Sequence, residues 1–308
     1  MSTYQTLFGL LLASVAVSIS TTPKVAKADT PAIPAETLKP TAATTGSTDV
    51  AKGGFVTAAA QKEDDPRQVT DLSLSLGGLF SSGNAKTIAL TSAAKFRLRR
   101  DDHQFSSALT ANFARAGKTG VPVDTTVENI QGLLRYDYFF GGRLGVFLQS
   151  TARKDRFQGL DLRLNVDPGL SYAAIDTKKH RLSIELGYDL QHDIRRDESR
   201  VQPVPADAAP GTVLPLLDKT QTLHNVRAFA GYENKLYKEV SFNLSLEYLQ
   251  SMKDVGVYRL IFDTGLKTQL VGKLAIATTY TMRFENRPLP TVEKVDSLAA
   301  VNLVYTLF

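Results

Sequence analysis

An alternation of apolar and polar residues recurs from residue 70 to the C-terminus and limits the folds open to this chain. In LDLRLNVD, residues 160–167, leucine and valine occupy the even positions, while aspartate, arginine and asparagine occupy the odd ones. Successive side chains of a β-strand point to opposite faces, so such a segment has one apolar face and one charged face. Because no segment has a convincing helical period, the pattern predicts an all-β domain.

The alternation divides into about twelve segments, and the short connections between them favour antiparallel pairing. Connections after the even-numbered segments are tight. Those after the odd-numbered segments include long ones, of which RRDESRVQPVPADAAPGTVLPLLDK is the longest. We expect strands near residues 70–82, 85–99, 102–116, 125–140, 143–155, 159–175, 179–194, 219–233, 237–251, 255–269, 272–285 and 294–308.

An even number of long amphipathic strands, with short turns at one end and long loops at the other, is typical of a transmembrane barrel. Such strands cross the bilayer with about 9–11 tilted residues, and closure satisfies every backbone polar group in lipid. We therefore predict an antiparallel up-and-down transmembrane β-barrel over residues 70–308, with its apolar face toward lipid and its charged face toward the lumen. The alternative is a soluble exported β-sandwich, but soluble strands usually have about 3–10 residues.

The N-terminal part of the chain differs from the barrel region. LFGLLLASVAVSIS, followed by the small-x-small pattern of Ala26 to Ala28, predicts a signal peptide over residues 1–28. Residues 29–69 are rich in Ala, Thr and Pro and predict a flexible periplasmic extension. The net charge of +5 is spread along the chain, so we expect no nucleic-acid partner.

Three stretches resemble the signature blocks of a bacterial family: LSLGGLFSSGNAKTIALTSAAKFRLRR, RYDYFFGGRLGVFLQSTARKDRFQGLDLRLNVDPGLSY and IDTKKHRLSIELGYDLQHD. They resemble the YdiY-like salt-induced outer membrane proteins, a family of unknown function, over about residues 70–308. The resemblance implies an outer membrane barrel of a Gram-negative bacterium and brings no substrate or catalytic residue. The C-terminal AVNLVYTLF is similar to the signal read by the outer membrane assembly machinery, with Phe308 as its terminal aromatic residue. Outer membrane lipids and that machinery are the partners this implies.

Charged residues of both signs recur on the polar face, and eight of them form the candidate site. Two roles are open for them. They can be a salt-bridged plug, since buried charges are costly unless paired, or the lining of a weakly selective pore. The mixed signs favour the structural role. The predicted lumen charge cluster comprises Arg135, Asp137, Arg153, Asp155, Asp161, Arg163, Asp167 and Glu185.

The polar residues around Gln158 and Gly159 have a second interpretation. This pair suits a hairpin turn, and Asp155 and Asp161 flank it among arginines. Two carboxylates at such a turn can do acid–base work, but a cross-strand ion-pair cluster at the barrel rim is favoured.

No constellation predicts catalysis or metal binding. Ser199 and His192 have no spacing that supports a nucleophile and a base. The acidic residues Asp193, Asp197 and Glu198 lack the ligand spacing of a calcium loop, so we expect neither metal nor cofactor. The prediction is a monomeric, non-enzymatic barrel for passive permeation of small solutes or ions, or for envelope integrity under osmotic or salt stress. An outer membrane enzyme acting at the barrel rim is the alternative.

Overall fold

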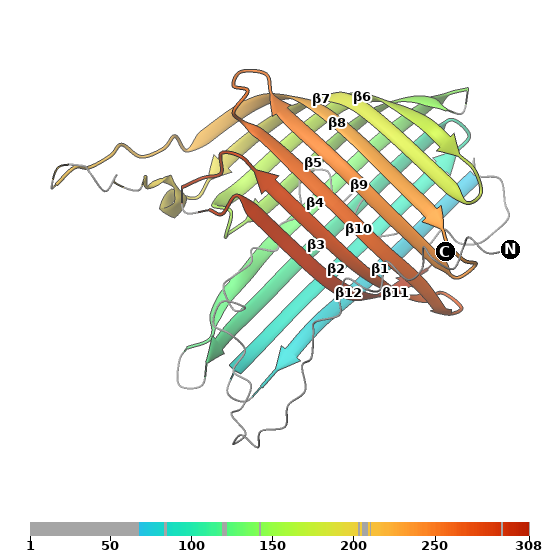
Figure 1. The fold of residues 1–308 in the computed structure, drawn as a ribbon, viewed down its shortest axis with the longest axis horizontal. Helices are drawn as coiled ribbons and strands as arrows, with labels where there is room; N and C mark the ends of the chain where they lie inside the picture. Colours follow the sequence, from blue (N-terminus) through green and yellow to red (C-terminus); the bar gives the residue numbers. More distant parts are fainter. Residues whose placement is uncertain are drawn as a thin grey trace, which may run out of the picture. The chain divides into compact units, whose positions relative to one another are not determined.

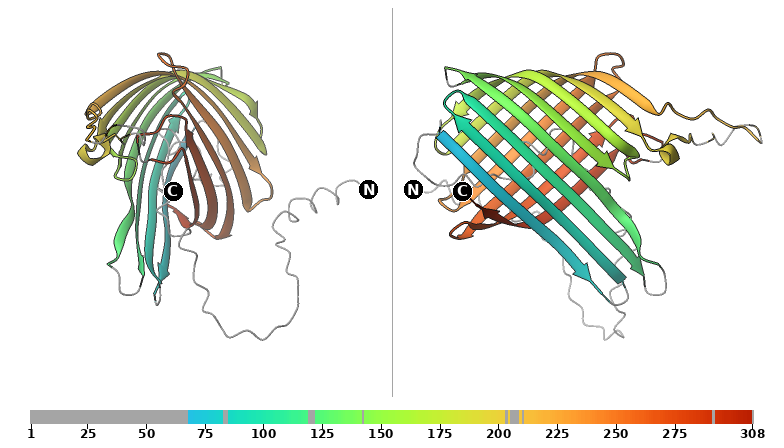
Figure 2. Two further views of the ribbon diagram at one scale, coloured as in Figure 1. Left: turned by 60° about the vertical axis from the view of Figure 1, so that its left-hand side comes forward. Right: turned by 180° about the vertical axis from the view of Figure 1, so that it is seen from behind.

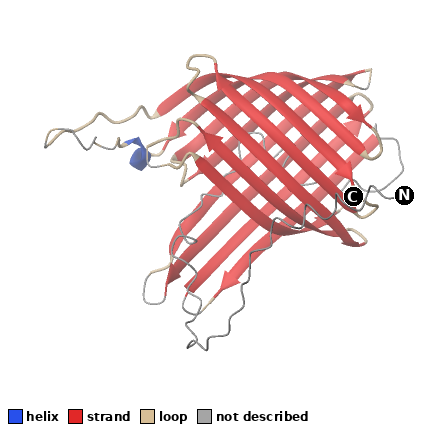
Figure 3. Ribbon diagram, viewed as in Figure 1, coloured by secondary structure: helices blue, strands red, loops and turns tan. Residues whose placement is uncertain are grey.

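A computed structural model describes residues 68–82, 85–118, 122–141, 143–202, 204, 209, 211–290 and 292–307. The predicted signal peptide, residues 29–67 of the predicted extension and Phe308 lie outside the described residues. Figure 3 shows that the described chain is almost entirely strand, with one short 3-10 helix, η3 (Asp197–Arg200), in a long loop. The strands are β1 (Gln68–Ser81), β2 (Ala85–Arg100), β3 (His103–Lys118), β4 (Asp124–Phe140), β5 (Leu144–Asp155), β6 (Leu160–Asp176), β7 (His180–Arg195), β8 (Thr220–Lys235), β9 (Val240–Ser251), β10 (Tyr258–Val271), β11 (Leu274–Glu285) and β12 (Val295–Thr306).

Each strand pairs antiparallel with the next along the chain, and β1 pairs with β12 to close the barrel (Figure 1). The predicted twelve-stranded up-and-down barrel is confirmed, and the predicted segments match the strands to within a few residues. The sandwich alternative is wrong, because a single sheet closes on itself and leaves no second sheet to pack against.

The barrel wall is polar inside and apolar outside. On β4, Arg135 and Asp137 are buried at 5% and 2% exposure, whereas Leu134 and Tyr136 are 57% and 46% exposed. The same alternation runs along β5, β7 and β9. This is the reverse of a water-soluble protein and matches a wall that faces lipid. Among the described residues, no helix has the length and hydrophobicity needed to cross a membrane.

The two ends of the barrel carry different connections, as predicted. At one end, tight turns after β4 and β10 place Gly141 and Gly272 at φ of 59° and 55°, a conformation that favours glycine. At the other end, the connection between β7 and β8 projects from the barrel and contains η3 (Figure 2). The lumen is therefore bordered by short turns at one end and by long loops at the other.

The seam between β1 and β12 is the weakest junction of the wall. Every other neighbouring pair runs in register over most of the strand length, whereas this pair shares only four positions. Figures 1 and 2 show the two strands separating toward the long-loop end. The four paired positions are Ser73↔Thr306, Leu74↔Tyr305, Ser75↔Val304 and Leu76↔Leu303.

Candidate functional site

A carboxylate held between two arginines lies at the centre of the lumen. Glu185 on β7 accepts hydrogen bonds from Arg135 Nη2 and from Arg227 Nη1, each at 3.0 Å. All three side chains are at most 5% exposed. Arg135 lies on β4, three strands away from Glu185 along the wall, so this bridge spans the lumen and does not follow a single strand pair.

The bridge extends at both ends into further ion pairs. Arg135 also binds Asp137, with Nη2 2.6 Å from Oδ1, and Arg227 Nε donates to Glu247 Oε1 at 2.6 Å. Charge-assisted hydrogen bonds of this kind are the strong ones, and they offset the cost of burying charge. Arg135, Glu185, Arg227, Asp137 and Glu247 are hereafter called the central bridge.

The aromatic ring of Phe147 contacts both arginines of the central bridge. The Arg135 guanidinium lies 4.0 Å from the centroid of the Phe147 ring, and that of Arg227 lies 5.5 Å from it. The ring occupies the space beside Gly169, where an added Cβ would come within 2.5 Å of Phe147 Cζ. Glycine on β6 therefore makes room for the ring, and cation–π attraction holds both guanidiniums in place.

A second group of pairs lies nearer the long loops. Arg163 on β6 makes a bidentate pair with Asp193 on β7, with both nitrogen–oxygen distances at 2.7 Å. Arg153 pairs with Asp155, whose Oδ1 accepts the backbone N–H groups of residues 157 and 158 at 3.0 Å. Asp155 therefore both neutralises an arginine and fixes the hairpin turn that follows it.

Asp167 belongs to a hydrogen-bonded carboxylate layer between these groups. Gln149 Nε2 donates to Asp167 Oδ2 at 2.9 Å. Neighbouring Asp189 accepts from Asn165 and Asn225, both at 2.6 Å. These amides provide hydrogen-bond donors to carboxylates that lie at 0% exposure.

Asp161 lies outside this interior, and its predicted place in the lumen cluster is wrong. Its side chain is 41% exposed and pairs with Arg196 and Lys219 at the loop end, at 3.5 and 3.3 Å. The cause is a β-bulge between Leu160 and Leu162, where the pairing with β7 shifts by one residue. An extra residue inverts the in–out alternation, so Leu160 points inward at 1% exposure in place of Asp161. Asp161 does form ion pairs at the rim, but with Arg196 and Lys219. Asp155 pairs with Arg153 inside the barrel, so the two carboxylates do not form the single predicted cluster.

Asp193, in contrast to Asp161, lies inside the barrel although it was not among the predicted lumen residues. In the sequence, Asp193 belongs with Asp197 and Glu198 to one acidic group, but its side chain is 4% exposed inside the barrel. It follows Asp189 and Gln191 at two-residue spacing on the same strand, and this spacing could have identified it. Among the described residues, no group of His, Cys, Asp and Glu is arranged to hold a metal ion.

The hairpin between β5 and β6 folds across the long-loop mouth of the barrel. Gln158 Nε2 donates to Asp296 Oδ2 on β12 at 2.9 Å, and both side chains are buried. The β5–β6 turn and β12 are about half the barrel circumference apart in strand order, so this contact spans the opening. Gly159 permits the inward turn with a φ of 70°, as its predicted hairpin role requires.

Residues 74–307 match the family described as "Protein of unknown function, DUF481". This chain belongs to the DUF481 family. Comparison with the curated proteins finds no match.

Several solved structures resemble this DUF481 barrel at low identity. NanC porin is 12% identical with a TM-score of 0.41, covering 77% of this chain and 98% of that one. An outer membrane channel from Pseudomonas putida F1 is 9% identical with a TM-score of 0.41, covering 80% and 99%. The translocator domain of autotransporter NalP from Neisseria meningitidis is 12% identical with a TM-score of 0.38, covering 77% and 86%. Likeness at this level carries no information on function.

The histidines of the DUF481 barrel lie on its outer wall near the two ends. His103 and His180 contact the hydroxyls of Tyr136 and Tyr232 at 2.6 and 2.8 Å, close to the short turns. His192 contacts Thr222 Oγ1 at 2.9 Å, on the side of the long loops. Amphipathic rings at these levels are typical of the interfacial belts of membrane proteins.

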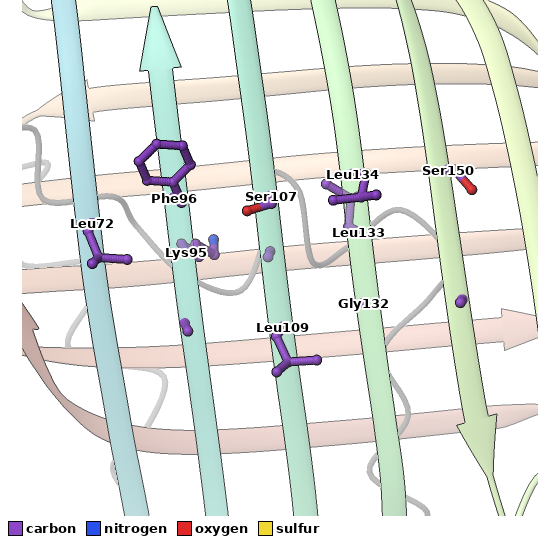
Figure 4. A pocket seen from close by; sticks show the side chains of 12 residues that line it. Leu72, Lys95, Phe96, Ser107, Leu109, Gly132, Leu133, Leu134 and Ser150 are labelled. Carbon is purple, nitrogen blue, oxygen red and sulfur yellow. The ribbon is translucent and has the colours of Figure 1, made fainter.

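The outer wall also has a shallow groove of about 500 Å³ across β1–β5 (Figure 4). Leu72, Leu109 and Leu134 line it around Gly132, whose missing side chain leaves the space. Its lining is mostly apolar, so in a membrane barrel we assign it to lipid contact and not to a polar ligand.

Proposed function

We propose that this barrel is a narrow, weakly selective conduit for ions and small polar solutes in the outer membrane of a Gram-negative bacterium. The observation that supports the proposal is the interior charge of the barrel. Among the described residues, ten acidic and nine basic side chains are buried. Such a balanced lining gives water and small ions of either sign polar partners without strongly selecting one sign.

The cost of these charges argues that they serve more than stability. Buried ion pairs are often no more stabilising than well-packed uncharged residues of the same volume. A barrel that needed only a filled interior could use uncharged side chains. Ionisable residues inside membrane segments are therefore taken as functional by default. In this proposal the central bridge narrows the bore and sets the size limit for solutes.

A structural role in envelope integrity is the second candidate. It is favoured by the contact between Gln158 and Asp296, which spans the long-loop mouth. The resemblance to the YdiY-like salt-induced proteins agrees with a role under osmotic or salt stress. In both candidates the barrel acts as a monomer without a catalytic centre. The assembly machinery reads Phe308 when it inserts the barrel among outer membrane lipids.

Planar-bilayer recordings of the refolded chain test the conduit directly, and Lys267 provides the sharpest variant. This lysine on β10 is 5% exposed, and its Nζ makes no hydrogen bond to the described residues. Lys267→Gln therefore removes a lumen charge without leaving a hydrogen-bond acceptor unpaired. Arg181→Gln is the matched control, because Arg181 is 51% exposed at the short-turn end.

The conduit predicts discrete openings with a reversal potential near zero in a salt gradient. Lys267→Gln should shift that potential toward cation preference, whereas Arg181→Gln should leave it unchanged. A folded barrel, identified by heat-modifiable gel migration, that stays electrically silent would reject the conduit and leave envelope integrity as the function.

A further inference from the structure

Two carboxylates face each other on the lumen side of the β6–β7 strand pair. Val166 pairs with Leu190 in this register, so the next position places Asp167 directly opposite Asp189. Side chains opposite each other in an antiparallel pair have Cβ atoms about 4.5–5.5 Å apart, and like charges at such positions repel. Both aspartates are 0% exposed, and their carboxylates approach to hydrogen-bonding contact.

Neutral amides, and not arginines, hold this pair of carboxylates in place. Gln149 on β5 donates to Asp167 at 2.9 Å, and Asn225 on β8 donates to Asp189 at 2.6 Å. The register places these four residues in one row across four neighbouring strands. An amide orients a carboxylate without cancelling its charge, so the row positions two negative charges and neutralises neither.

The arginines around the pair are bound to other carboxylates. Among the described residues, neither Asp167 nor Asp189 forms an ion pair. Burying an unpaired charge is costly, so the two aspartates require a positive partner. The arginines whose charges act on them are already paired: Arg227 with Glu185 and Glu247, Arg163 with Asp193, and Arg259 with Glu285.

An amide oxygen beside the pair also lacks a partner. Asn165 lies two residues before Asp167 on the same face of β6, and its Nδ2 donates to Asp189 Oδ1 at 2.6 Å. Asn165 is 0% exposed, and its Oδ1 has no hydrogen-bond donor among the described residues. Asp167 Oδ1 has none either. Buried acceptors are almost always satisfied, so two such oxygens in one place point to a bound group.

A proton shared by the two carboxylates and a cation bound between them are the two ways to supply the positive charge. One proton satisfies a single oxygen of Asp167, leaves a negative charge on the pair and gives Asn165 Oδ1 no partner. A divalent cation cancels both charges and takes oxygens from all three side chains. Calcium binds carboxylate and amide oxygens, and the carboxylates that ligate a metal are in turn hydrogen-bonded, as both aspartates are here.

We propose that Asp167, Asp189 and Asn165 bind a divalent cation of the calcium type, which joins β6 to β7 inside the lumen. With two carboxylates and one amide oxygen, this site differs from the groups of three or more His, Cys, Asp and Glu that the described residues lack. The cation site goes beyond the proposed axial conduit and does not depend on it.

Calcium binding is measurable on the refolded full chain in phosphatidylcholine vesicles. Equilibrium dialysis with radioactive calcium, after treatment with a chelator, counts the ions bound per barrel. The native chain should bind one ion more than Asp167→Asn or Asp189→Asn, since each change removes one charge and keeps the size of the side chain. Asp263→Asn is the matched control, because Asp263 is 2% exposed but lies opposite Ser245 and Thr281 and not opposite a carboxylate.

Urea unfolding gives a second readout of the same site. Calcium should raise the unfolding midpoint of the native barrel and of Asp263→Asn, because a ligand that binds only the folded chain stabilises it. The midpoints of Asp167→Asn and Asp189→Asn should not respond to calcium. Heat-modifiable gel migration shows which variants fold. If neither of the two does, Asn165→Ala tests the site in their place, with weaker calcium binding expected.

Equal calcium binding by the native chain and by the site variants would overturn the proposal. A native barrel that neither binds calcium nor responds to it in urea would also overturn it. If Asp167→Asn were then as stable as the native chain, the pair would share a proton, because an amide replaces a protonated carboxyl group. Conductance is not part of either readout, so failure of the cation site and failure of the conduit are distinguishable.

Discussion

The Thr91 hydroxyl on β2 donates a hydrogen bond to Asn302 on β12 at 2.8 Å, directly over Gly77 of the intervening strand. Two strands that are not neighbours in the sheet are thereby joined across the one junction with little backbone pairing. The absence of a side chain at Gly77 makes this contact possible.

Gly77→Ala should weaken the seam. The added Cβ would displace Thr91 or Asn302, and overpacking of this kind costs about 1–3 kcal/mol. Urea unfolding of the barrel in lipid vesicles measures the change. Gly78→Ala is the control, because its Cβ meets only Ala89 O at 3.3 Å. Equal stability of the two variants would show that the hydrogen bond between Thr91 and Asn302 contributes nothing to the stability of the barrel.

Glu185→Ala should be the most destabilising change among the lumen charges. It leaves Arg135 and Arg227 buried without their shared carboxylate, and breaking a buried pair costs about 3–5 kcal/mol. Urea unfolding of the barrel in lipid vesicles again measures the change in stability. Glu233→Ala is the comparison, since Glu233 is 55% exposed and pairs with Arg181 at 3.7 Å. Exposed pairs contribute about 0–1 kcal/mol, so that variant should unfold close to the native chain.

Gln158→Ala should open the long-loop mouth. The change removes the donor to Asp296 and releases the β5–β6 hairpin from β12. We expect larger single-channel conductance with little change in gel migration. Gln202→Ala, which removes a loop contact to Pro215 O, should leave conductance unaltered. A decrease in conductance in Gln158→Ala would indicate that the contact holds the mouth open.

The loop between β7 and β8 should respond to acid. Hydrogen bonds from Lys219 and Arg200 lower the pKa of the Asp197 carboxyl. A lowered pKa means that the contact is fully present above the ordinary carboxyl pKa and is lost as pH falls through the lowered value. A nitroxide at Ser199→Cys should therefore be restrained at neutral pH and mobile in strong acid. In Lys219→Met the mobility should depend less on pH, and an unchanged profile would refute this role of Lys219.

The strand order and most of the inward-facing residues follow from the sequence alone. The two-residue period is a local property, so Arg135, Asp137, Arg153, Asp155, Arg163, Asp167 and Glu185 could be assigned to the lumen before any contact was known. The alternation of short and long connections determined which ends of the strands meet. Enzymatic activity, oligomeric state and partners stay predictions.

How those residues pair with one another depends on the three-dimensional fold. The bulge at Leu160 turned Asp161 outward, because one inserted residue inverts the alternation without changing the composition of the segment. Closure of the sheet brought Arg135 to Glu185 and Gln158 to Asp296, pairs that lie on strands far apart in the wall. The four-residue seam likewise depends on how β1 meets β12, since closure sets the register between the two ends of the chain and no local period encodes it.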